Sequence, residues 1–381
     1  MTQLTASIAG GGIGGLATAA ALAQRGWQVS VYERQDQLRA VGAGIYIWEN
    51  GLRVLEALGA FEQATADAFH GTHFEQRDNN GDIIDSAAIG GGNRLLTVPR
   101  SQLLDALRDA CDRADVEIFT NTEITGANSR GELYLADGSI VSADLAVGVD
   151  GIWSKVRQSL ALELSHEQTI EGALRTMVRA EPGDFDSEDV GKYIECWHGA
   201  RRFLVTPVNE KYTYLALTCP DTDRAAAAMP VNKALWKESF PKWSHLIDRI
   251  GEYTVNWGVY SVIRCSSWSS GRTAIVGDAA HAQTPNLGQG GGMAMQNGLA
   301  LAVALEAVSD RRDIPDALEK WESDERDIVE HCQRWASLYG EVTHLPDEVR
   351  TKVIRGAMSD PWIAGQIFRA AGHAPKGTTA P

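Results

Sequence analysis

The first 33 residues constrain the fold most strongly, because they read as a strand, a glycine turn, a helix and a second strand. An apolar run over residues 4–9 leads into GGGIGG, alanines and leucines follow at helical spacing, and an alternating stretch ends at Glu33. Gly10, Gly12 and Gly15 have the spacing G-x-G-x-x-G, and Glu33 follows Gly10 by 23 residues. This order of elements predicts a β-α-β unit that binds a dinucleotide.

The chemistry of dinucleotide binding explains the glycines of that unit. They let the backbone approach a pyrophosphate, whose charge the helix N-terminus stabilises, while a carboxylate at the end of the second strand accepts hydrogen bonds from ribose hydroxyls. We therefore expect Glu33 to bind a ribose. The loop residues expected at the cofactor are Gly10, Gly12, Ile13, Gly14 and Gly15. The alternative is a glycine-rich turn of an unrelated α/β protein, because the pattern alone is weak.

The acidic balance of the chain excludes several classes of partner. With 50 acidic and 35 basic residues the formal net charge is −15, so we expect neither nucleic acid nor an anionic membrane surface to bind. No apolar run is long enough to span a bilayer, and residues 1–6 lack the basic start of a signal peptide. The five cysteines lie far apart without a C-x-x-C pair, which favours reduced thiols in a cytoplasmic protein.

A change of pattern in the middle of the chain predicts an inserted domain. Residues 201–218 read as two strands around a turn near Asn209, with residues 192–197 as a neighbouring strand, and residues 293–340 are helical. The expected fold is α/β, with a Rossmann-like dinucleotide-binding domain, an inserted and mostly antiparallel substrate domain, and C-terminal helices. The predicted boundaries are residues 1–72, 95–170 and 266–335 for the discontinuous first domain, 73–94 and 171–265 for the insertion, and 336–381 for a C-terminal helical segment with a flexible tail.

Residues 274–292 indicate which dinucleotide fits. Asp278 follows a buried strand, and His281 lies three residues further on. The glycines that precede the next helical stretch are Gly288, Gly290, Gly291 and Gly292. A second helix N-terminus would suit an oxygen that gains negative charge, such as the C2 carbonyl of a reduced flavin. Asp278 and His281 could instead form a metal site, but a metal needs at least three ligands and no His or Cys cluster supplies the others, so we expect no metal.

Together these motifs resemble the single-component FAD-dependent aromatic hydroxylases, the class A flavoprotein monooxygenases. The similar stretches are GGGIGGL at residues 10–16, VDGIWSKVR at 149–157, GDAAHAQTPNLGQGGGMAM at 277–295 and WESDER at 321–326. Within that family, residues 38–60 are similar to oxygenases of hydroxypyridine carboxylates. The resemblance implies non-covalent FAD, NADH or NADPH as a transient co-substrate, dioxygen and a small aromatic substrate; it implies no particular oligomeric state.

The resemblance also implies roles for single residues. Along the cofactor it places Glu33 and Arg34 at the adenosine end, Ile124 beside the adenine, Arg100 on the FAD backbone, Asp278 at the ribityl chain, Ala43 and Gly44 along the flavin, Pro285 beside it, and Gly291 and Gly292 at its pyrimidine edge. In the substrate pocket it places Tyr46, Arg175, Arg202 and Tyr214, with Phe74 in place of a pocket tyrosine and His73 as a possible compensation. Two arginines would suit an aromatic carboxylate or phenolate. His281 receives only a structural role.

The register of the predicted hairpin decides whether Arg202 and Tyr214 share a face. A three-residue turn over residues 208–210 pairs Leu204 with Tyr214 and puts Arg202 on the same face, whereas a two-residue turn does not. The alternative is that Arg202 faces solvent, as we expect of Arg201.

The resemblance predicts the function of an FAD-dependent monooxygenase, which uses NAD(P)H and dioxygen to hydroxylate an electron-rich aromatic ring. The expected substrate is a hydroxypyridine carboxylate or a related aromatic acid, and ring opening could follow. The alternatives are a flavin oxidase or dehydrogenase acting on a small amine or another heterocycle, and a non-redox FAD-binding protein of the same fold.

Overall fold

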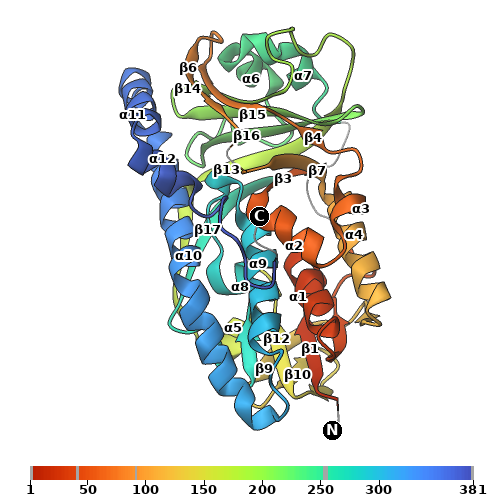
Figure 1. The fold of residues 1–381 in the computed structure, drawn as a ribbon. Coiled ribbons are helices and arrows are strands. Elements are labelled where there is room, and N and C mark those ends of the chain that lie inside the picture. Colours follow the sequence, from red (N-terminus) through yellow and green to blue (C-terminus); the bar gives the residue numbers. More distant parts are fainter. Residues whose placement is uncertain (1–2, 40–42, 91, 252–255, 379–381) are drawn as a thin grey trace.

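The computed structural model describes residues 3–39, 43–90, 92–251 and 256–378, which form two large and two small sheets, with a long helix running along one side (Figure 1). The first sheet has six strands in the order β18-β19-β12-β1-β2-β8. Their bounds are β18 (Ser269–Ser270), β19 (Thr273–Ile275), β12 (Leu145–Gly148), β1 (Thr5–Ala9), β2 (Gln28–Tyr32) and β8 (Glu117–Phe119). All neighbours are parallel except β18 and β19. The carboxyl ends of the parallel strands therefore meet at one edge, as the Rossmann-like prediction requires.

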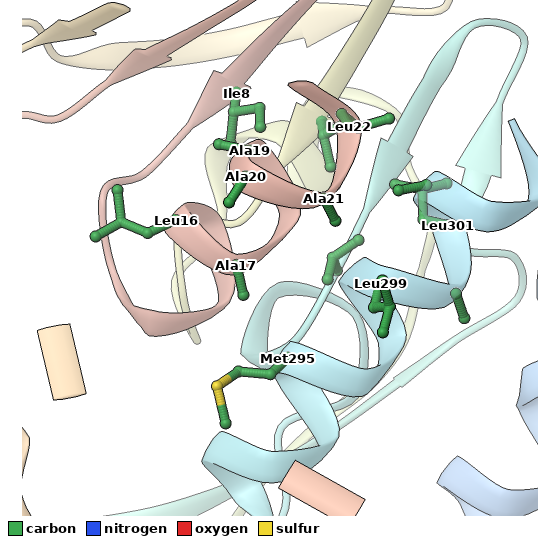
Figure 2. Close-up of a cluster of buried hydrophobic side chains, with 14 of the residues drawn as sticks. Ile8, Leu16, Ala17, Ala19, Ala20, Ala21, Leu22, Met295, Leu299 and Leu301 are labelled. Atoms are coloured by element: carbon green, nitrogen blue, oxygen red, sulfur yellow. The ribbon is translucent and has the colours of Figure 1, made fainter. Parts of the chain in front are cut away.

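The core of this domain lies around the first helix, α1 (Ile13–Ala23), which is buried on nearly all sides. It packs against α9 (Gly290–Ala304), and Figure 2 shows Leu16 and Ala17 of α1 with Met295 and Leu299 of α9 among the buried side chains. The two helices approach closely at Gly298, where a Cβ would lie only 2.2 Å from Thr18 Oγ1. The strand, turn and helix expected from the N-terminal sequence are confirmed.

The second sheet has seven strands in the order β17-β13-β16-β15-β14-β5-β6. Their bounds are β17 (Trp257–Cys265), β13 (Glu163–Arg179), β16 (Tyr212–Pro220), β15 (Arg201–Asn209), β14 (Lys192–His198), β5 (His73–Asp78) and β6 (Ile83–Ala88). Only β14 and β5 are parallel, which confirms a mostly antiparallel insertion. One face is apolar and packs under α6 (Lys233–Ser239) and α7 (Ser244–Asp248), where Phe203 stacks on Phe240 (Figure 1).

The hairpin between β15 and β16 corrects the predicted register. The turn has two residues, Glu210 and Lys211, and Thr206 rather than Leu204 lies opposite Tyr214. The register shifts between Pro207 and Asn209, so that an extra residue is inserted in β15. A bulge of this kind reverses the side on which the following residues lie, and it offsets the effect of the shorter turn. Arg202 and Tyr214 consequently do share a face, although not for the predicted reason.

Smaller elements complete the two domains. One three-stranded sheet contains β9 (Ile124–Asn128), β10 (Glu132–Leu135) and β11 (Ile140–Ser142), and another contains β3 (Gly44–Trp48), β4 (Phe69–His70) and β7 (Leu95–Pro99). The remaining helices of the first domain are α2 (Glu49–Ala57), α3 (Phe61–Thr65), α4 (Arg100–Arg113), α5 (Lys155–Ser159) and α8 (Asp278–His281), and the short 3-10 helices are η1 (Pro241–Trp243), η2 (Pro285–Leu287) and η3 (Arg311–Asp313). The C-terminal helices are α10 (Ile314–Val342), α11 (Asp347–Ser359) and α12 (Pro361–Phe368).

The elements cross two of the predicted domain boundaries. Strand β13 continues through residue 170, but its pairing with β17 shifts between Gln168 and Gly172, close to the predicted boundary. Helix α10 continues through residue 335 without a break. Residues 372–378, expected in a flexible tail, lie against the body, and Lys376 pairs with Asp324 at 2.6 Å. Residues 379–381 of that tail lie outside the described residues.

Candidate functional site

The glycine loop after β1 makes an open cradle at the carboxyl edge of the parallel sheet. Gly10 has φ +107°, and a Cβ there would lie 2.4 Å from the Val149 carbonyl oxygen, so this backbone conformation needs glycine. Gly12 immediately precedes α1, where no side chain caps the helix, and a Cβ at Gly12 would meet no atom within 4 Å. The positive end of α1 therefore faces open space, as an anion-binding site requires.

Glu33 closes one side of this cradle at the end of β2. Its carboxylate accepts hydrogen bonds from the backbone N–H of Gly11 at 2.8 Å and of Gln35 at 2.9 Å. An ionised carboxylate has further lone pairs, so Glu33 can still accept hydrogen bonds from the hydroxyls of a ribose. Arg34 is exposed beside it, and Ile124 is buried at the start of β9. These positions suit the adenosine end of a dinucleotide.

A second group of polar residues lies where β19 leads into α8. Asp278 is exposed, but the protein atoms around it raise the pKa of its carboxyl by desolvation, and the charges of Arg100 and Arg175 act in the opposite direction. Burial lowers the pKa of Arg100, as does the nearby charge of Arg175. The backbone N–H of Arg100 donates to the Ala43 carbonyl at 3.2 Å. The carboxyl of Asp278 thus interacts electrostatically with Arg100 of the first domain and with Arg175 of the inserted sheet.

The later glycines place a second helix N-terminus beside this group. Helix α9 begins at Gly290 without a side-chain cap, and a Cβ at Gly290 would meet no atom within 4 Å. Gly288 has φ +64°, and a Cβ there would come within 3.2 Å of the Tyr46 ring. The expected flavin-side residues that follow one another here are Pro285, Gly288, Gly290, Gly291 and Gly292. Two uncapped helix N-termini, with Glu33 and Asp278 as acceptors, form a donor and acceptor set that fits FAD.

The face of the seven-stranded sheet opposite the apolar core carries the predicted substrate-pocket residues. Cross-strand partners in register lie on the same face, and the register pairs Met177 with Tyr214, Tyr214 with Thr206, and Trp197 with Arg202. We call this the polar face. Its members are Phe74, Gln76, Glu171, Arg175, Met177, Tyr193, Glu195, Trp197, Arg202, Leu204, Thr206, Tyr214, Ala216, Thr218 and Tyr260. The structure therefore brings the four pocket residues of the inserted sheet, Phe74, Arg175, Arg202 and Tyr214, onto one surface.

Tyr46, from β3 of the first domain, meets this face. Its hydroxyl lies 2.5 Å from Thr206 Oγ1, and its ring is edge-on to Tyr214, with centroids 6.1 Å apart. Burial raises the pKa of Tyr46 well above its usual value, so the phenol stays neutral and can donate or accept a hydrogen bond. Tyr46 thus links the polar face to the residues that adjoin Gly288.

Arg175 is the cation of the polar face with the least compensation. Burial opposes its charge, but Tyr260 and Tyr214 outweigh that effect and raise its pKa. Its guanidinium carbon lies 5.4 Å from the centre of the Tyr260 ring. Within the part of the chain that the structure describes, no carboxylate lies within ion-pair distance of Arg175. A half-buried cation in aromatic surroundings is well suited to an anionic oxygen of a ligand.

Arg202 has a different environment. It is buried, so the solvent-facing alternative is wrong. Its Nη2 donates to Asn286 Oδ1 at 2.7 Å, and its Nη1 lies 3.4 Å from Glu195 Oε1. Arg201 points to the opposite face, as expected, but it is held by Asp223 at 2.8 Å rather than free in solvent. The charge of Arg202 is therefore already offset by the protein.

Phe74 and His73 do not act together. Phe74 lies beside Tyr193, with which it pairs in register, in an apolar cluster that includes Trp48. His73 lies on the other side of β5, because neighbouring residues of a strand alternate, and its Nδ1 is 3.0 Å from Thr72 Oγ1. His73 is therefore not placed to supply the hydrogen bond that Phe74 lacks.

His281 is enclosed by the first domain. Its Nε2 lies 3.2 Å from Asn297 Oδ1, and its ring centre is 5.4 Å from that of Trp268. Burial lowers the pKa of His281 to about 4, so the imidazole is neutral at neutral pH. No group of three or more potential metal ligands occurs among the residues that the structure describes. These surroundings are those of a packed core residue.

Several polar-face residues were missed by sequence reasoning. Glu195 and Thr206 lie at alternating positions on β14 and β15, so correct strand registers could have identified them. Tyr339 and Asn286 come from α10 and η2, and they reach the face through contacts that no local pattern indicates. The polar residues of the site are thus contributed by both domains and by the C-terminal helix.

Two open recesses adjoin the hairpin tip at one end of the polar face. Their volumes are about 460 and 690 Å³, and Asp67 and Asn209, which are hydrogen-bonded at 3.0 Å, line both. The smaller recess is also lined by Pro99, which precedes Arg100, and by Met177 of the polar face. It therefore borders the site from the side of α4.

Comparison with known proteins places this architecture among flavoproteins. The sequence model of the FAD-binding domain family matches residues 3–336. The chain is 40% identical over 358 residues to a Rhodococcus erythropolis protein named "Probable 2-heptyl-3-hydroxy-4(1H)-quinolone synthase AqdB2", covering 93% of this chain and 92% of that protein. It is 38% identical to a 2-heptyl-3-hydroxy-4(1H)-quinolone synthase of Mycobacteroides abscessus, over 84% of this chain and 86% of that one.

A solved structure is also similar over the whole chain. The tetrameric form of 2-methyl-3-hydroxypyridine-5-carboxylic acid oxygenase superposes with a TM-score of 0.87 at 32% identity, covering 100% of this chain and 99% of that one. This agreement confirms the α/β fold with its antiparallel insertion and C-terminal helices. Within the described ranges, no helix combines the length and apolar character needed to cross a membrane.

Proposed function

The chain belongs to the FAD-binding domain family and is an FAD-dependent aromatic monooxygenase, and we propose that its substrate is an electron-rich N-heteroaromatic ring whose oxygen is anionic or carries partial negative charge. A hydroxypyridine carboxylate or a related aromatic acid is the first candidate. The observation that carries the proposal is Arg175, a half-buried guanidinium on the polar face without a carboxylate partner among the described residues. An anionic oxygen of the ligand would supply that partner.

The protein's own residues would hold, orient and shield the reactants. FAD, reduced by NADH or NADPH, supplies the activated oxygen derived from dioxygen when it is bound. Glu33 would hold the ribose, Asp278 would accept hydrogen bonds from the ribityl chain, and the N-terminus of α9 would stabilise negative charge at the pyrimidine edge. Arg175 would orient the ring, while Tyr46 and Tyr214 would exclude water from the reacting face.

A 2-alkyl-4-quinolone is the second candidate substrate. It is favoured by the names of the two relatives, and by the ion pair between Arg202 and Glu195, which leaves Arg175 as the arginine of the polar face without a carboxylate at ion-pair distance among the described residues. Apolar members of the face, among them Met177, Leu204 and Ala216, could contact an alkyl chain. Arg175 would pair with the carboxylate of the first candidate, whereas it would donate a hydrogen bond to the 4-oxygen of the uncharged quinolone ring.

The test is substrate-stimulated NADH oxidation by the FAD-loaded protein, with hydroxypyridine carboxylates and 2-alkyl-4-quinolones supplied in parallel. Product mass then distinguishes a hydroxylated ring from an opened one. We expect stimulation by at least one of the two classes, together with stoichiometric hydroxylated product. NADH oxidation that no N-heteroaromatic compound stimulates, or that yields only hydrogen peroxide with all of them, would refute the proposal.

Substitution of Arg175 tests the observation on which the proposal depends. Arg175→Met should raise the Kd of the preferred anionic ligand roughly ten- to a hundredfold, because a charge-assisted hydrogen bond contributes about 1.5–3 kcal/mol. The matched control is Arg264→Met on the adjacent strand, whose exposed side chain pairs with Glu167 at 3.2 Å. Both Kd values are measured from the change in flavin absorbance. Equal Kd values for the two variants would place Arg175 outside the ligand site.

A further inference from the structure

We propose that Glu195 determines the ligand charge that the polar face accepts, because it offsets the charge of Arg202. The inference rests on the proposed function only in that an aromatic ligand binds to this face. No motif identifies Glu195, and its assignment depends on the contacts of a buried network that reaches from β14 to α10 and η2.

Glu195 is held in place by three side chains. Its Oε2 accepts a hydrogen bond from the Tyr339 hydroxyl at 2.5 Å and from Gln76 Nε2 at 3.3 Å, and its Oε1 lies 3.4 Å from Arg202 Nη1. Glu195, Gln76 and Arg202 are all buried, with 3%, 4% and 5% of their surface exposed. A carboxylate fixed in this way in a region of low dielectric interacts strongly with nearby charges.

Arg202 connects Glu195 with residues expected to lie near the ligand and the flavin. Its guanidinium lies over the Trp197 ring, with 5.4 Å between the guanidinium carbon and the ring centre, and it donates to Asn286 of η2 at 2.7 Å. Asn286 follows Pro285, which is expected beside the flavin. Arg202 and Arg175 lie opposite Thr218 and Ala216, which are neighbours on the polar face of β16, and the charge of Arg202 lowers the pKa of Arg175. A ligand at Arg175 therefore experiences the net charge of the Arg202 and Glu195 pair.

The positive charge of Arg202 is offset mainly by the carboxylate of Glu195. The nearby charge of Glu195 raises the pKa of Arg202 more than that of Glu171, although burial acts in the opposite direction. In the described part of the chain, Glu195 is the carboxylate within ion-pair distance of Arg202. With Glu195 ionised, its carboxylate offsets Arg202, and Arg175 is the arginine of the face that has no carboxylate within ion-pair distance among the described residues. With residue 195 neutral, Arg202 would add a second positive charge, and a carboxylate ligand would gain more from it than an uncharged ligand.

The experiment compares Glu195→Gln with Tyr339→Phe in FAD-loaded protein. Glutamine has nearly the shape of glutamate and can accept the same hydrogen bond from Tyr339, but it lacks the charge. Tyr339→Phe breaks a contact of the same network without changing its charge. The ligands are 4-quinolone-2-carboxylate and its primary amide, which have the same ring and differ in charge. Their Kd values are measured from flavin absorbance, and the ratio of amide Kd to carboxylate Kd is calculated for each protein.

Glu195→Gln should increase that ratio by at least about tenfold relative to the unmodified protein. Tyr339→Phe should change this ratio of Kd values by less than about twofold. The variant removes a hydrogen bond to Glu195 but no charge, so the affinities of the two ligands should fall equally. A ratio that does not rise in Glu195→Gln, or that rises equally in both variants, would overturn the inference. A failure of either ligand to bind the Glu195→Gln variant would also overturn it. Failure of the proposed function is a separate result, because it appears as absent turnover and not as an unchanged binding ratio.

Discussion

The buried imidazole of His281 has a measurable consequence for stability. Its pKa of about 4 lies below the ordinary value of 6.5, so the unfolded chain binds a proton between these values when the folded chain does not. Its contribution to stability is therefore complete above pH 6.5 and is lost as the pH falls toward 4. Between pH 7.5 and pH 5 the unfolding free energy should fall about 2 kcal/mol further in the natural protein than in His281→Gln. Parallel curves from denaturant titrations at the two pH values would contradict this prediction.

Asp278, three residues before His281, should contribute to FAD binding rather than to stability. Asp278→Ala removes a charged acceptor close to Arg100, and we expect FAD to bind more weakly by about 1.5–3 kcal/mol. His281→Ala should leave FAD binding nearly unchanged, because the imidazole contacts Asn297 and Trp268 inside the domain. Titration of FAD into the apoprotein measures both constants. The assignment of the two residues is reversed if His281→Ala is the variant that loses FAD.

At the scale of elements, two glycines of the loop between β1 and α1 should have different roles, one in the stability of the fold and the other in cofactor binding. A Cβ at Gly15 would lie 2.0 Å from the Gly10 carbonyl oxygen, so Gly15→Ala should destabilise the apoprotein itself. A Cβ at Gly12 would meet no protein atom within 4 Å, and its φ of −80° suits any residue. Gly12→Ala should therefore keep the Tm of the apoprotein and weaken FAD binding by tenfold or more. An unchanged FAD affinity in Gly12→Ala would show that the pyrophosphate does not approach this loop.

Sequence patterns were sufficient to predict some elements of the fold but not the register of others. Strand β1, helix α1 and strand β2 follow from local periodicity and glycine spacing, and they form the predicted unit. The hairpin between β15 and β16 was recognised from alternation, but its register was not, because the bulge near Val208 is set by packing. Val208 is fully buried against Tyr214 and Ala43, a contact between segments far apart in the chain. Patterns of period two indicate a strand and do not report such contacts.

At the scale of the molecule, the inserted domain and the carboxyl-edge residues could be predicted, since each has its own motif or change of pattern. The polar network around Arg202 could not. Tyr339, Asn286 and Glu195 come from three separate elements, and their contacts exist only after the two domains and α10 have packed together. Sequence reasoning therefore placed Arg202 on the correct face and missed that a carboxylate already offsets its charge.

The C-terminal helices join the two domains, and this gives a last prediction. Arg350 of α11 donates to the carbonyl of Gly199, in the turn between β14 and β15, at 2.7 Å, and Arg355 donates to the carbonyl of Ile84 in β6 at 3.0 Å. Ala371 accepts a hydrogen bond from the backbone N–H of Asn50 in the first domain at 3.1 Å. A chain that ends at residue 344 loses these bonds and the burial of α11, on the order of 3–5 kcal/mol.

Such a truncation should lower the Tm by several degrees, because it exposes surfaces of both domains. It should also weaken ligand binding at the polar face, since the aromatic cluster that contains Ala371 includes Tyr46 and Phe74 at its margin. The control is Lys376→Ala, which removes only an ion pair with Asp324, and which should change stability by less than about 1 kcal/mol. If the truncated chain kept both its Tm and its ligand Kd, the C-terminal helices would be an accessory to the fold. A loss of both would show that the polar face requires the end of the chain for its shape.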